Sequence, residues 1–290
     1  MICIKLMGGL GNQMFQYSIG LSLARIMGTH FVLDDSILKS NMLINKNSVK
    51  RTFDLDIFTL DNSVYRGVIT IETNKIKRNL NKILPLNLRS YITEASYDFD
   101  PNLFFLRNNN ITLEGYWQSY KYFSNFTNEI RGSFTLRNSF VNLNDTLFEE
   151  IANSESVCIN VRRADFETNS YHGTLNIDYY KEAVELLSIR KSVNFNFFIF
   201  SDDIQWCMKN FDFLPLKTFV DHSHKGDMFS NYFALMSSCK YFIIPNSSFA
   251  WWAAWLSTSP SKLVICPKTW FLGDPMNKTK DLIPGEWIRI

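Results

Sequence analysis

Five polar clusters follow five short apolar runs in the second half of the chain, and their residue types suit the binding of an anion. An arginine presents a planar fork of N–H groups that grips a phosphate and stays charged. A carboxylate can accept two hydrogen bonds from the edge of a guanine base, and serines at a helix start offer hydroxyl and N–H groups to an anion. The clusters are Arg162, Arg163 and Asp165; Asp202 and Asp203; Asp221 to His224; Asn246, Ser247 and Ser248; and Pro267 with Lys268.

These residues also have a structural interpretation. Arg162 and Arg163 could form ion pairs with Asp165 or with other acidic residues, and Asp202 could cap the helix that follows it. One polar cluster would mean little, because loops are polar in general. Five clusters together predict a site for an anionic ligand.

The elements that position these clusters alternate between strands and helices. Amphipathic periodicity predicts helices that begin near Asp178, Asp203, Asp227 and Ser248. Strands that alternate with helices of this size form a parallel sheet, and ligands bind beyond the carboxyl ends of its strands. The strands are predicted at 157–161, 195–200, 218–220, 241–244 and 263–266.

The first half begins in the same way, with a strand at 2–6, a loop Gly8 to Gly11 and a helix from Asn12. The loop follows a strand and precedes a helix, but it does not match the dinucleotide motif G-x-G-x-x-G. Strands are also predicted at 31–33 and 111–114, whereas residues 41–110 show no clean period. We therefore predict an α/β protein of two Rossmann-like domains, 1–150 and 151–290.

Length and composition agree with two globular domains and limit the classes of function. The chain has 290 residues and a net charge of +2, which argues against a nucleic-acid binder that relies on bulk charge. Five scattered cysteines without a C-x-x-C pattern suggest neither a disulfide framework nor a zinc site. No apolar run is long enough to cross a bilayer or to act as a signal peptide, so a cytoplasmic protein is expected.

Two further patterns, the D-x-D pairs and a cluster of tryptophans, are explained most simply without a functional role. Two D-x-D pairs, 54–56 and 98–100, could hold a metal on a nucleotide sugar, but neither sits clearly at a strand end beside a phosphate site. Trp251, Trp252 and Trp255 lie on one helix face and are interpreted as core. Chance and packing therefore explain these patterns best.

Five segments resemble the motifs of the α-1,2-fucosyltransferases of glycosyltransferase family 11. They occur in the family's order and span nearly the whole chain, so the resemblance is specific. The chain's size and lack of a membrane anchor resemble the bacterial members, which fucosylate O-antigen or oligosaccharide acceptors. The segments are GGLGNQMFQYS (8–18), GYWQSYKYF (115–123), NVRRADF (160–166), FSDDIQWC (200–207) and IIPNSSFAWWAAWL (243–256).

The resemblance implies a GT-B architecture, in which two Rossmann-like domains face each other across a cleft. It implies that the C-terminal domain binds GDP-fucose and that the N-terminal domain shapes the acceptor side. The implied reaction is an inverting, metal-independent transfer of L-fucose to the 2-OH of a galactose, with no cofactor. The acceptor would be a galactose-containing oligosaccharide or lipid-linked glycan, and any contact with the inner face of the membrane would come through that lipid.

Carried over by position, Arg162 would bind the β-phosphate and stabilise the leaving group, while Arg163 and Asp165 would order the loop. Asp202 or Asp203 would read guanine. The catalytic base is not identified: Asp165 is the nearest carboxylate in sequence, and it could equally pair with Arg163. The diphosphate would contact Asn246, Ser247 and Ser248, and the acceptor-side candidates are Gly9, Asn12, Gln13 and Gln118.

The chain departs from the family at Asn160, where the motif H-x-R-R-x-D usually begins with histidine. If that histidine were the general base, this chain would lack it, at a typical cost of about 10²- to 10⁴-fold in rate. Alternatively, the histidine only hydrogen-bonds the donor or the backbone, which asparagine can also do. We favour the second interpretation and place Asn160 in the donor site.

Three other functions fit parts of the sequence. A transferase that uses another GDP-deoxysugar, such as colitose, would share all of these motifs. The glycine loop alone would suit a nicotinamide-dependent oxidoreductase. The 15% of aromatic residues would suit a glycan-binding protein without catalysis.

Overall fold

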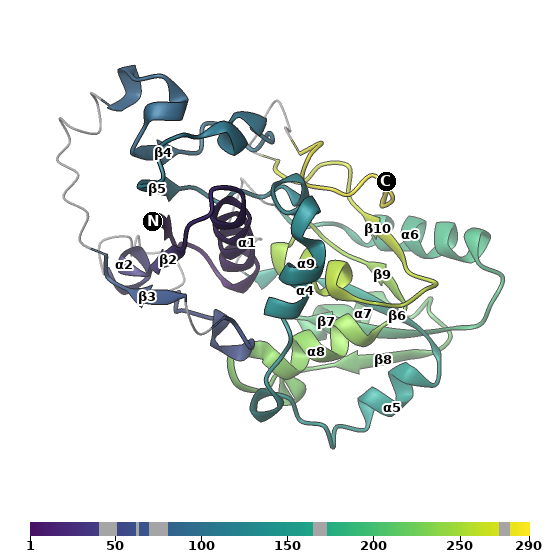
Figure 1. The fold of residues 1–290 in the computed structure, drawn as a ribbon. Helices are drawn as coiled ribbons and strands as arrows, with labels where there is room; N and C mark the ends of the chain where they lie inside the picture. Colours follow the sequence, from purple (N-terminus) through teal and green to yellow (C-terminus); the bar gives the residue numbers. More distant parts are fainter. Residues whose placement is uncertain (41–50, 62–63, 70–80, 165–172, 273–278) are drawn as a thin grey trace. The chain divides into compact units, whose positions relative to one another are not determined.

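The computed structural model describes residues 1–40, 51–61, 64–69, 81–164, 173–272 and 279–290. The chain forms two compact units, each with its own parallel sheet (Figure 1). Unit 1 contains Met1–Thr135 and Lys278–Ile283, and unit 2 contains Leu136–Asn277 and Pro284–Ile290. The predicted α/β class with parallel sheets is confirmed.

The first division between the units falls after Thr135, whereas the sequence pattern predicts a boundary near residue 150. The segment that suggested a linker contains helix α5, Leu147–Ala152. This helix packs against strand β6, Glu155–Val161, and helix α8, Ser230–Ser238, of unit 2, and its side chains of Leu147 and Ile151 are buried. It therefore belongs to unit 2.

The sheet of unit 1 has five parallel strands in the order β3-β2-β1-β5-β4. Helix α1, Leu10–Ile26, is buried almost all round and packs against β1 and β2. Gly20 permits this close approach, because a Cβ there would lie 2.7 Å from the ring of Phe31 and 2.8 Å from Ile4. The strands are β1, Ile2–Lys5; β2, Phe31–Asp34; β3, Tyr65–Gly67; β4, Tyr91–Thr93; and β5, Ile111–Glu114; two further helices are α2, Ser36–Lys39, and α4, Thr127–Ser133.

A late segment of the chain, Lys278–Ile283, returns to unit 1. Asp281 attaches this segment to unit 1. Its carboxylate lies 2.5 Å from Lys121 Nζ and accepts a 3.1 Å hydrogen bond from the Phe99 backbone N–H. The backbone carbonyl of Asp281 accepts a further bond of 2.8 Å from the Ser119 hydroxyl. These contacts span more than 150 residues, so local sequence patterns give no sign of them.

The sheet of unit 2 has six parallel strands in the order β11-β10-β9-β6-β7-β8. Strand β6 lies centrally, between β7 and β9, so the loops after these three strands emerge at neighbouring points of one sheet edge. The strands are β6, Glu155–Val161; β7, Phe195–Ser201; β8, Lys217–Val220; β9, Tyr241–Ile243; β10, Leu263–Cys266; and β11, Ile288–Arg289.

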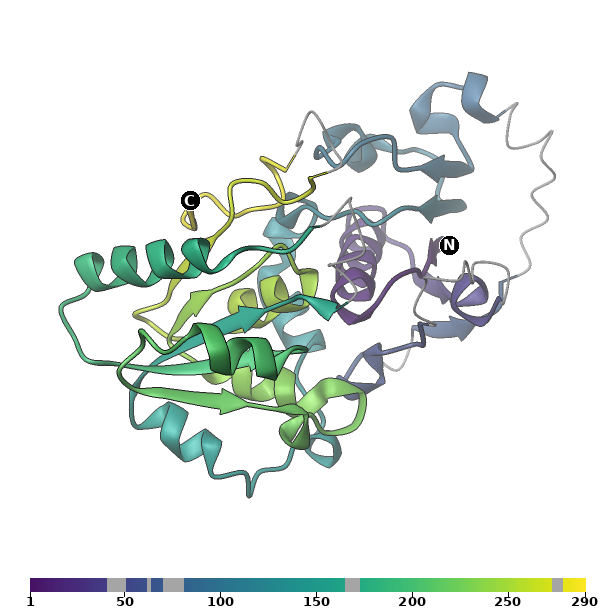
Figure 2. The same ribbon diagram turned by 180° about the vertical axis from the view of Figure 1, so that it is seen from behind.

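Helices cover both faces of this sheet. Helices α6, Ile177–Arg190, and α7, Ile204–Asn210, lie on one face, nearest the viewer in Figure 2. Helices α8, Ser230–Ser238, and α9, Ser248–Leu256, lie on the opposite face, nearest the viewer in Figure 1. Trp251 and Trp252 of α9 are fully buried, which confirms their interpretation as core.

Helix α6 begins at Ile177, near the predicted Asp178, whereas helix α8 begins three residues after the predicted Asp227. Helix α6 is capped by Asn176, whose side chain accepts the Tyr179 N–H at 3.2 Å, and not by Asp178. Helix α8 begins at Ser230 and not at Asp227, because Met228 and Phe229 take left-handed φ values of 51° and 60°. These two residues form a separate turn before the helix.

Two expectations from the sequence concern the cysteines and helices that could cross a membrane. All five cysteines are buried and free in the structure. None of the helices in the described part of the chain is long and apolar enough to cross a membrane.

Candidate donor and acceptor sites

Two arginine–aspartate pairs join the ends of strands β6 and β7. Arg162 Nη1 lies 2.8 Å from Asp202 Oδ2, and Arg163 Nε lies 3.4 Å from Asp203 Oδ2. The register explains both pairs: Val161 lies opposite Ser201, so the next two residues of each strand continue side by side. The arginines therefore pair with the predicted guanine readers. The predicted alternative partner, Asp165, lies outside the described residues.

The two arginines differ in exposure and in their ring contacts. The Arg163 guanidinium stacks 4.2 Å from the ring centroid of Trp206, and its side chain is 15% exposed. The Arg162 side chain is 32% exposed. Because a stacked and paired guanidinium is held in place, Arg163 suits an ordering role, and Arg162 is the better placed of the two to meet a ligand.

Asp202 and Asp203 also differ in exposure and in the backbone N–H groups that they accept. Asp202, 10% exposed, accepts the backbone N–H of Arg163 at 2.9 Å in addition to its ion pair with Arg162. Asp203, 35% exposed, caps helix α7 by accepting the Trp206 N–H at 3.0 Å. Asp202 is a possible cap from the sequence, but the structure places the cap one residue later. Asp202 instead fastens the loop after β6.

Asn160 lies inside strand β6 and forms hydrogen bonds with residues of β7 and α6. Its side-chain amide donates to the Phe200 carbonyl at 3.2 Å, and its own carbonyl accepts from the Tyr180 hydroxyl at 3.2 Å. The side chain is buried. This geometry agrees with the interpretation that position 160 supports the backbone of the loop.

The fourth predicted cluster, Asn246 to Ser248, lies at the start of helix α9. Ser247 is its N-cap and accepts the Ala250 N–H at 3.5 Å, and Ser248 is the first helical residue. Asn246 is buried and donates to the Trp270 carbonyl at 2.9 Å. A helix N-terminus carries a partial positive charge, so this cluster suits an anionic group.

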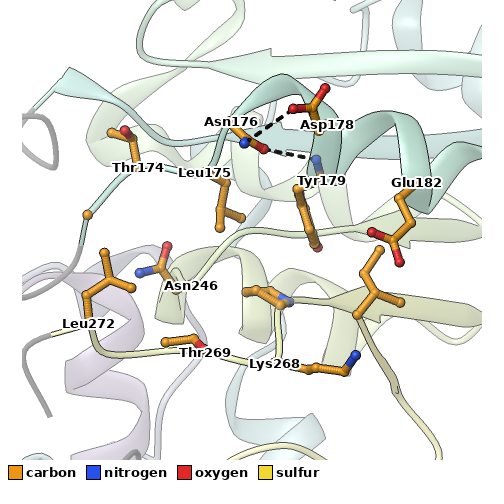
Figure 3. A pocket seen from close by; sticks show the side chains of 13 residues that line it. Thr174, Leu175, Asn176, Asp178, Tyr179, Glu182, Asn246, Lys268, Thr269 and Leu272 are labelled. Atoms are coloured by element: carbon orange, nitrogen blue, oxygen red, sulfur yellow. Dashed lines mark hydrogen bonds between the residues drawn. The ribbon is translucent and has the colours of Figure 1, made fainter. Parts of the chain in front are cut away.

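A pocket of about 410 Å³ lies beside Asn246, between the start of α6 and the residues that follow β10 (Figure 3). Asn176, Asp178 and Glu182 line it from α6 and its cap, and Lys268 and Thr269 line it from the other side. The mixture of one amine, carboxylates, amides and a hydroxyl suits a polyhydroxylated ligand. Of the predicted site residues, Asn246 alone lines this pocket. Lys268 was predicted only as part of a strand-end cluster, and the α6 residues were missed.

Two of the predicted acceptor-side residues meet at the edge of the sheet of unit 1. Gln118, in the loop after β5, donates through Nε2 to Asn12 Oδ1 at 2.7 Å, at the start of α1. Gly9 is the N-cap of α1, and its carbonyl accepts the Asn12 and Gln13 N–H groups. Strands β1 and β5 are neighbours, so the structure brings together the GGLGNQ and GYWQSY segments.

Gln13 has a structural role instead. Its Nε2 donates to the carbonyls of Gly8 at 3.0 Å and Thr52 at 2.7 Å, and its Oε1 accepts the Asp54 N–H at 2.9 Å. The side chain is fully buried. The side-chain amide of Gln13 is bonded to backbone groups at both its nitrogen and its oxygen, so Gln13 fixes the loop from 51 to 54. It is therefore poorly placed to contact an acceptor.

Gly8, rather than Gly9, has the backbone that demands glycine. Its φ is +77°, and a Cβ there would lie 2.3 Å from Asn12 Nδ2. We expect Gly8→Ala to destabilise the protein by more than the roughly 1–2 kcal/mol that a left-handed φ alone costs and to displace Asn12, measured as a lower melting temperature and weaker acceptor binding. Gly28→Ala is the matched control, since Gly28 also has positive φ but has nothing within 4 Å of a Cβ. Equal effects of the two substitutions would contradict the clash with Asn12.

The D-x-D pairs have local partners. Asp54 accepts the Thr52 hydroxyl at 2.7 Å, and Asp56 pairs with Arg66 at 2.8 Å. Asp100 caps the short 3₁₀ helix Pro101–Phe105. Among the described residues there is no group of three His, Cys, Asp or Glu side chains that could hold a metal ion.

The family model described as glycosyl transferase family 11 matches residues 1–290. The chain therefore belongs to this family and is a glycosyltransferase. It is 32% identical to the O-antigen biosynthesis glycosyltransferase WbnK of Escherichia coli, over 98% of this chain and 99% of that protein. It is 33% identical to an alpha-1,2-colitosyltransferase of Escherichia coli, over 100% and 98% of the two chains.

Solved structures share the fold at low sequence identity. A variant of FUT1 from Arabidopsis thaliana in complex with GDP aligns with a TM-score of 0.54 at 10% identity, over 91% of this chain and 69% of that chain. The fucosyltransferase NodZ from Bradyrhizobium aligns with a TM-score of 0.51 at 15% identity, over 87% and 90%. With the two parallel sheets, this likeness confirms the predicted GT-B class of fold.

Proposed function

We propose that the protein transfers L-fucose from GDP-β-L-fucose to the 2-OH of a β-galactoside, with inversion to an α-1,2 linkage. The observation that carries this proposal is the pairing of Arg162 with Asp202 and of Arg163 with Asp203 at the ends of β6 and β7. In this arrangement an arginine guanidinium, which suits a phosphate, lies beside an aspartate carboxylate, which can accept hydrogen bonds from guanine. The start of α9 adds a second group suited to a diphosphate.

Of the two aspartates, Asp203 is the better guanine reader. Each carboxylate has a partner at both oxygens, but the Asp202 side chain is mostly buried and its contact with Arg162 is only 2.8 Å long. Asp203 is more exposed, and its contact with Arg163 is longer. Asp203 would accept the N1–H and N2–H of guanine, while Asp202 holds the loop that carries Arg162.

In the proposed reaction the acceptor hydroxyl attacks C1 of fucose and loses its proton as GDP leaves from the opposite face. The bond between C1 and the β-phosphate oxygen breaks, and negative charge grows on that oxygen. Arg162 and the N-terminus of α9 stabilise this charge, so the proposed step requires no metal. Asp165 stays a candidate for the base, outside the described residues.

The donor sugar has a second candidate. The relative named as an alpha-1,2-colitosyltransferase supports transfer of a deoxysugar through an α-1,2 linkage, with colitose as the alternative to fucose. The relative WbnK supports a role in O-antigen synthesis, with a galactose-containing oligosaccharide or lipid-linked glycan as acceptor. Competition between GDP-fucose and GDP-colitose in one transfer reaction distinguishes the two donors.

Thermal stabilisation by nucleotides tests the donor site before any acceptor is known. We expect GDP to raise the melting temperature, because a ligand that binds only the folded protein stabilises it. NAD should have no effect if the glycine loop after β1 is not a dinucleotide site. Stabilisation by NAD and not by GDP would instead support an oxidoreductase and contradict the proposal.

A further inference from the structure

Glu94 follows strand β4 at the edge of the unit 1 sheet, beside the segment that carries Gln118. Its carboxylate accepts two backbone N–H groups of one loop, from Tyr116 at 2.7 Å and from Trp117 at 2.9 Å. Its own N–H donates to the Glu114 carbonyl at 2.9 Å. Glu94 therefore fastens the end of β5 and the loop after it to β4.

The loop that Glu94 holds has a constrained backbone. Trp117 takes a left-handed φ of 55°, which is unusual for a large side chain. A Cβ on Gly115 would lie 2.4 Å from Glu94 Cβ, so only glycine lets the two segments approach this closely. The carboxylate thus compensates for a conformation that the loop would otherwise avoid.

The loop presents two buried polar atoms that have no hydrogen-bond partner among the described residues, Gln118 Oε1 and Trp117 Nε1. Both side chains are more than nine-tenths buried. Buried polar atoms are nearly always paired, so such atoms mark a place that a polar ligand or water would complete. The other end of the Gln118 amide is fixed by its bond to Asn12.

We propose that Glu94 is a positioning residue of the acceptor site, which holds the Tyr116–Trp117 backbone so that Gln118 and Trp117 present their polar atoms to the acceptor sugar. A galactoside offers both the hydroxyl donors and the oxygen acceptors that an amide oxygen and an indole N–H require. This inference rests on the proposed function, and it deepens that proposal by naming a residue that orders the acceptor side.

Glu94 also gives the site a pH dependence. Burial raises the pKa of Glu94 to about 7 from its ordinary value of 4.5, against the opposing effect of its two backbone hydrogen bonds. Tyr122 interacts electrostatically with Glu94, Asp100 and Asp281, and Glu114 precedes the loop. Protonation of Glu94 weakens one of its two acceptor oxygens, so the loop loosens as the pH falls through about 7.

The test compares Glu94→Gln with wild type at about pH 6 and about pH 8, with Glu129→Gln as a control carboxylate of unit 1. Glutamine keeps the shape but has one acceptor oxygen. We expect the variant to raise the acceptor KM about tenfold at pH 8 and to leave the KM for GDP-fucose unchanged. The wild-type acceptor KM should rise toward pH 6, and the variant should lose this dependence.

A second readout does not depend on transfer. Burial disfavours the Glu94 carboxylate and raises its pKa, so the folded protein loses stability relative to the unfolded chain as the pH rises from about 4.5 through about 7, although the ionised form holds the loop with both oxygens. The melting temperature of Glu94→Gln relative to wild type should therefore increase between pH 6 and pH 8. Hydrogen exchange at the Tyr116 and Trp117 amides should be faster in the variant.

The outcomes separate the two proposals. An acceptor KM that Glu94→Gln leaves unchanged, or equal losses for donor and acceptor, would overturn the positioning role while transfer itself stands. If wild type transfers no sugar, the proposed function fails. Glu94 is then judged by calorimetric titration of a β-galactoside with GDP present, where unchanged affinity in the variant overturns the inference and about tenfold weaker binding supports it.

Discussion

Arg162→Ala should lower kcat for transfer from GDP-fucose about tenfold to a hundredfold. A charge-assisted hydrogen bond contributes about 1.5–3 kcal/mol, and the growing charge on the departing phosphate needs this bond more than the ground state does. Arg162→Lys keeps a positive charge but not the planar fork, so it should retain an intermediate rate. Initial rates of GDP release at saturating donor and acceptor measure the effect.

The control for this experiment is Arg190→Ala, at the exposed end of α6. Loss of Arg162 also deprives the mostly buried Asp202 of its cation, so melting temperatures must accompany the rates. A folded Arg162→Ala variant with a near-normal rate would remove Arg162 from the mechanism.

Asp203→Asn should weaken GDP binding about tenfold to a hundredfold and reduce the preference for guanine over adenine nucleotides. Asparagine caps a helix as well as aspartate does, so α7 should stay intact and the melting temperature should change little. The variant cannot accept both guanine N–H groups, because its amide nitrogen replaces one carboxylate oxygen. Calorimetric titration with GDP and ADP measures both effects.

Asp212→Asn serves as the control, since this aspartate is exposed and lies 3.9 Å from Lys217 on the surface of unit 2. Asp202→Asn provides the decisive comparison. If Asp202→Asn loses guanine preference and Asp203→Asn does not, the roles that we assign to the two residues must be exchanged.

The sequence predicts the second unit well because its strands are short, apolar and separated by clear helix signals. Strand β10 and helix α9 have the predicted bounds. Strand β6 starts two residues earlier than predicted, since Glu155 is polar but pairs with Lys240 at 2.8 Å. Strands β3 and β4 were missed because each has three residues and Tyr65 of β3 is exposed.

The sequence predicts which residue types form the site, but not which of these residues pair with one another. The sequence places Arg162 and Asp202 at strand ends, and only the register of β6 with β7 shows that they pair. Glu94 was missed because it follows the short strand β4 in a region without periodicity. Gln13 was assigned to the acceptor because a buried amide and a ligand-binding amide have the same sequence signal.

The central claim is tested most directly by incubating the protein with GDP-fucose and a small panel of β-galactosides in the presence of EDTA. We predict GDP release that is stoichiometric with a product carrying α-linked fucose on the galactose 2-OH, identified by NMR of the glycan. Failure of both GDP-fucose and GDP-colitose to give a product, or loss of transfer on adding EDTA, would contradict the account.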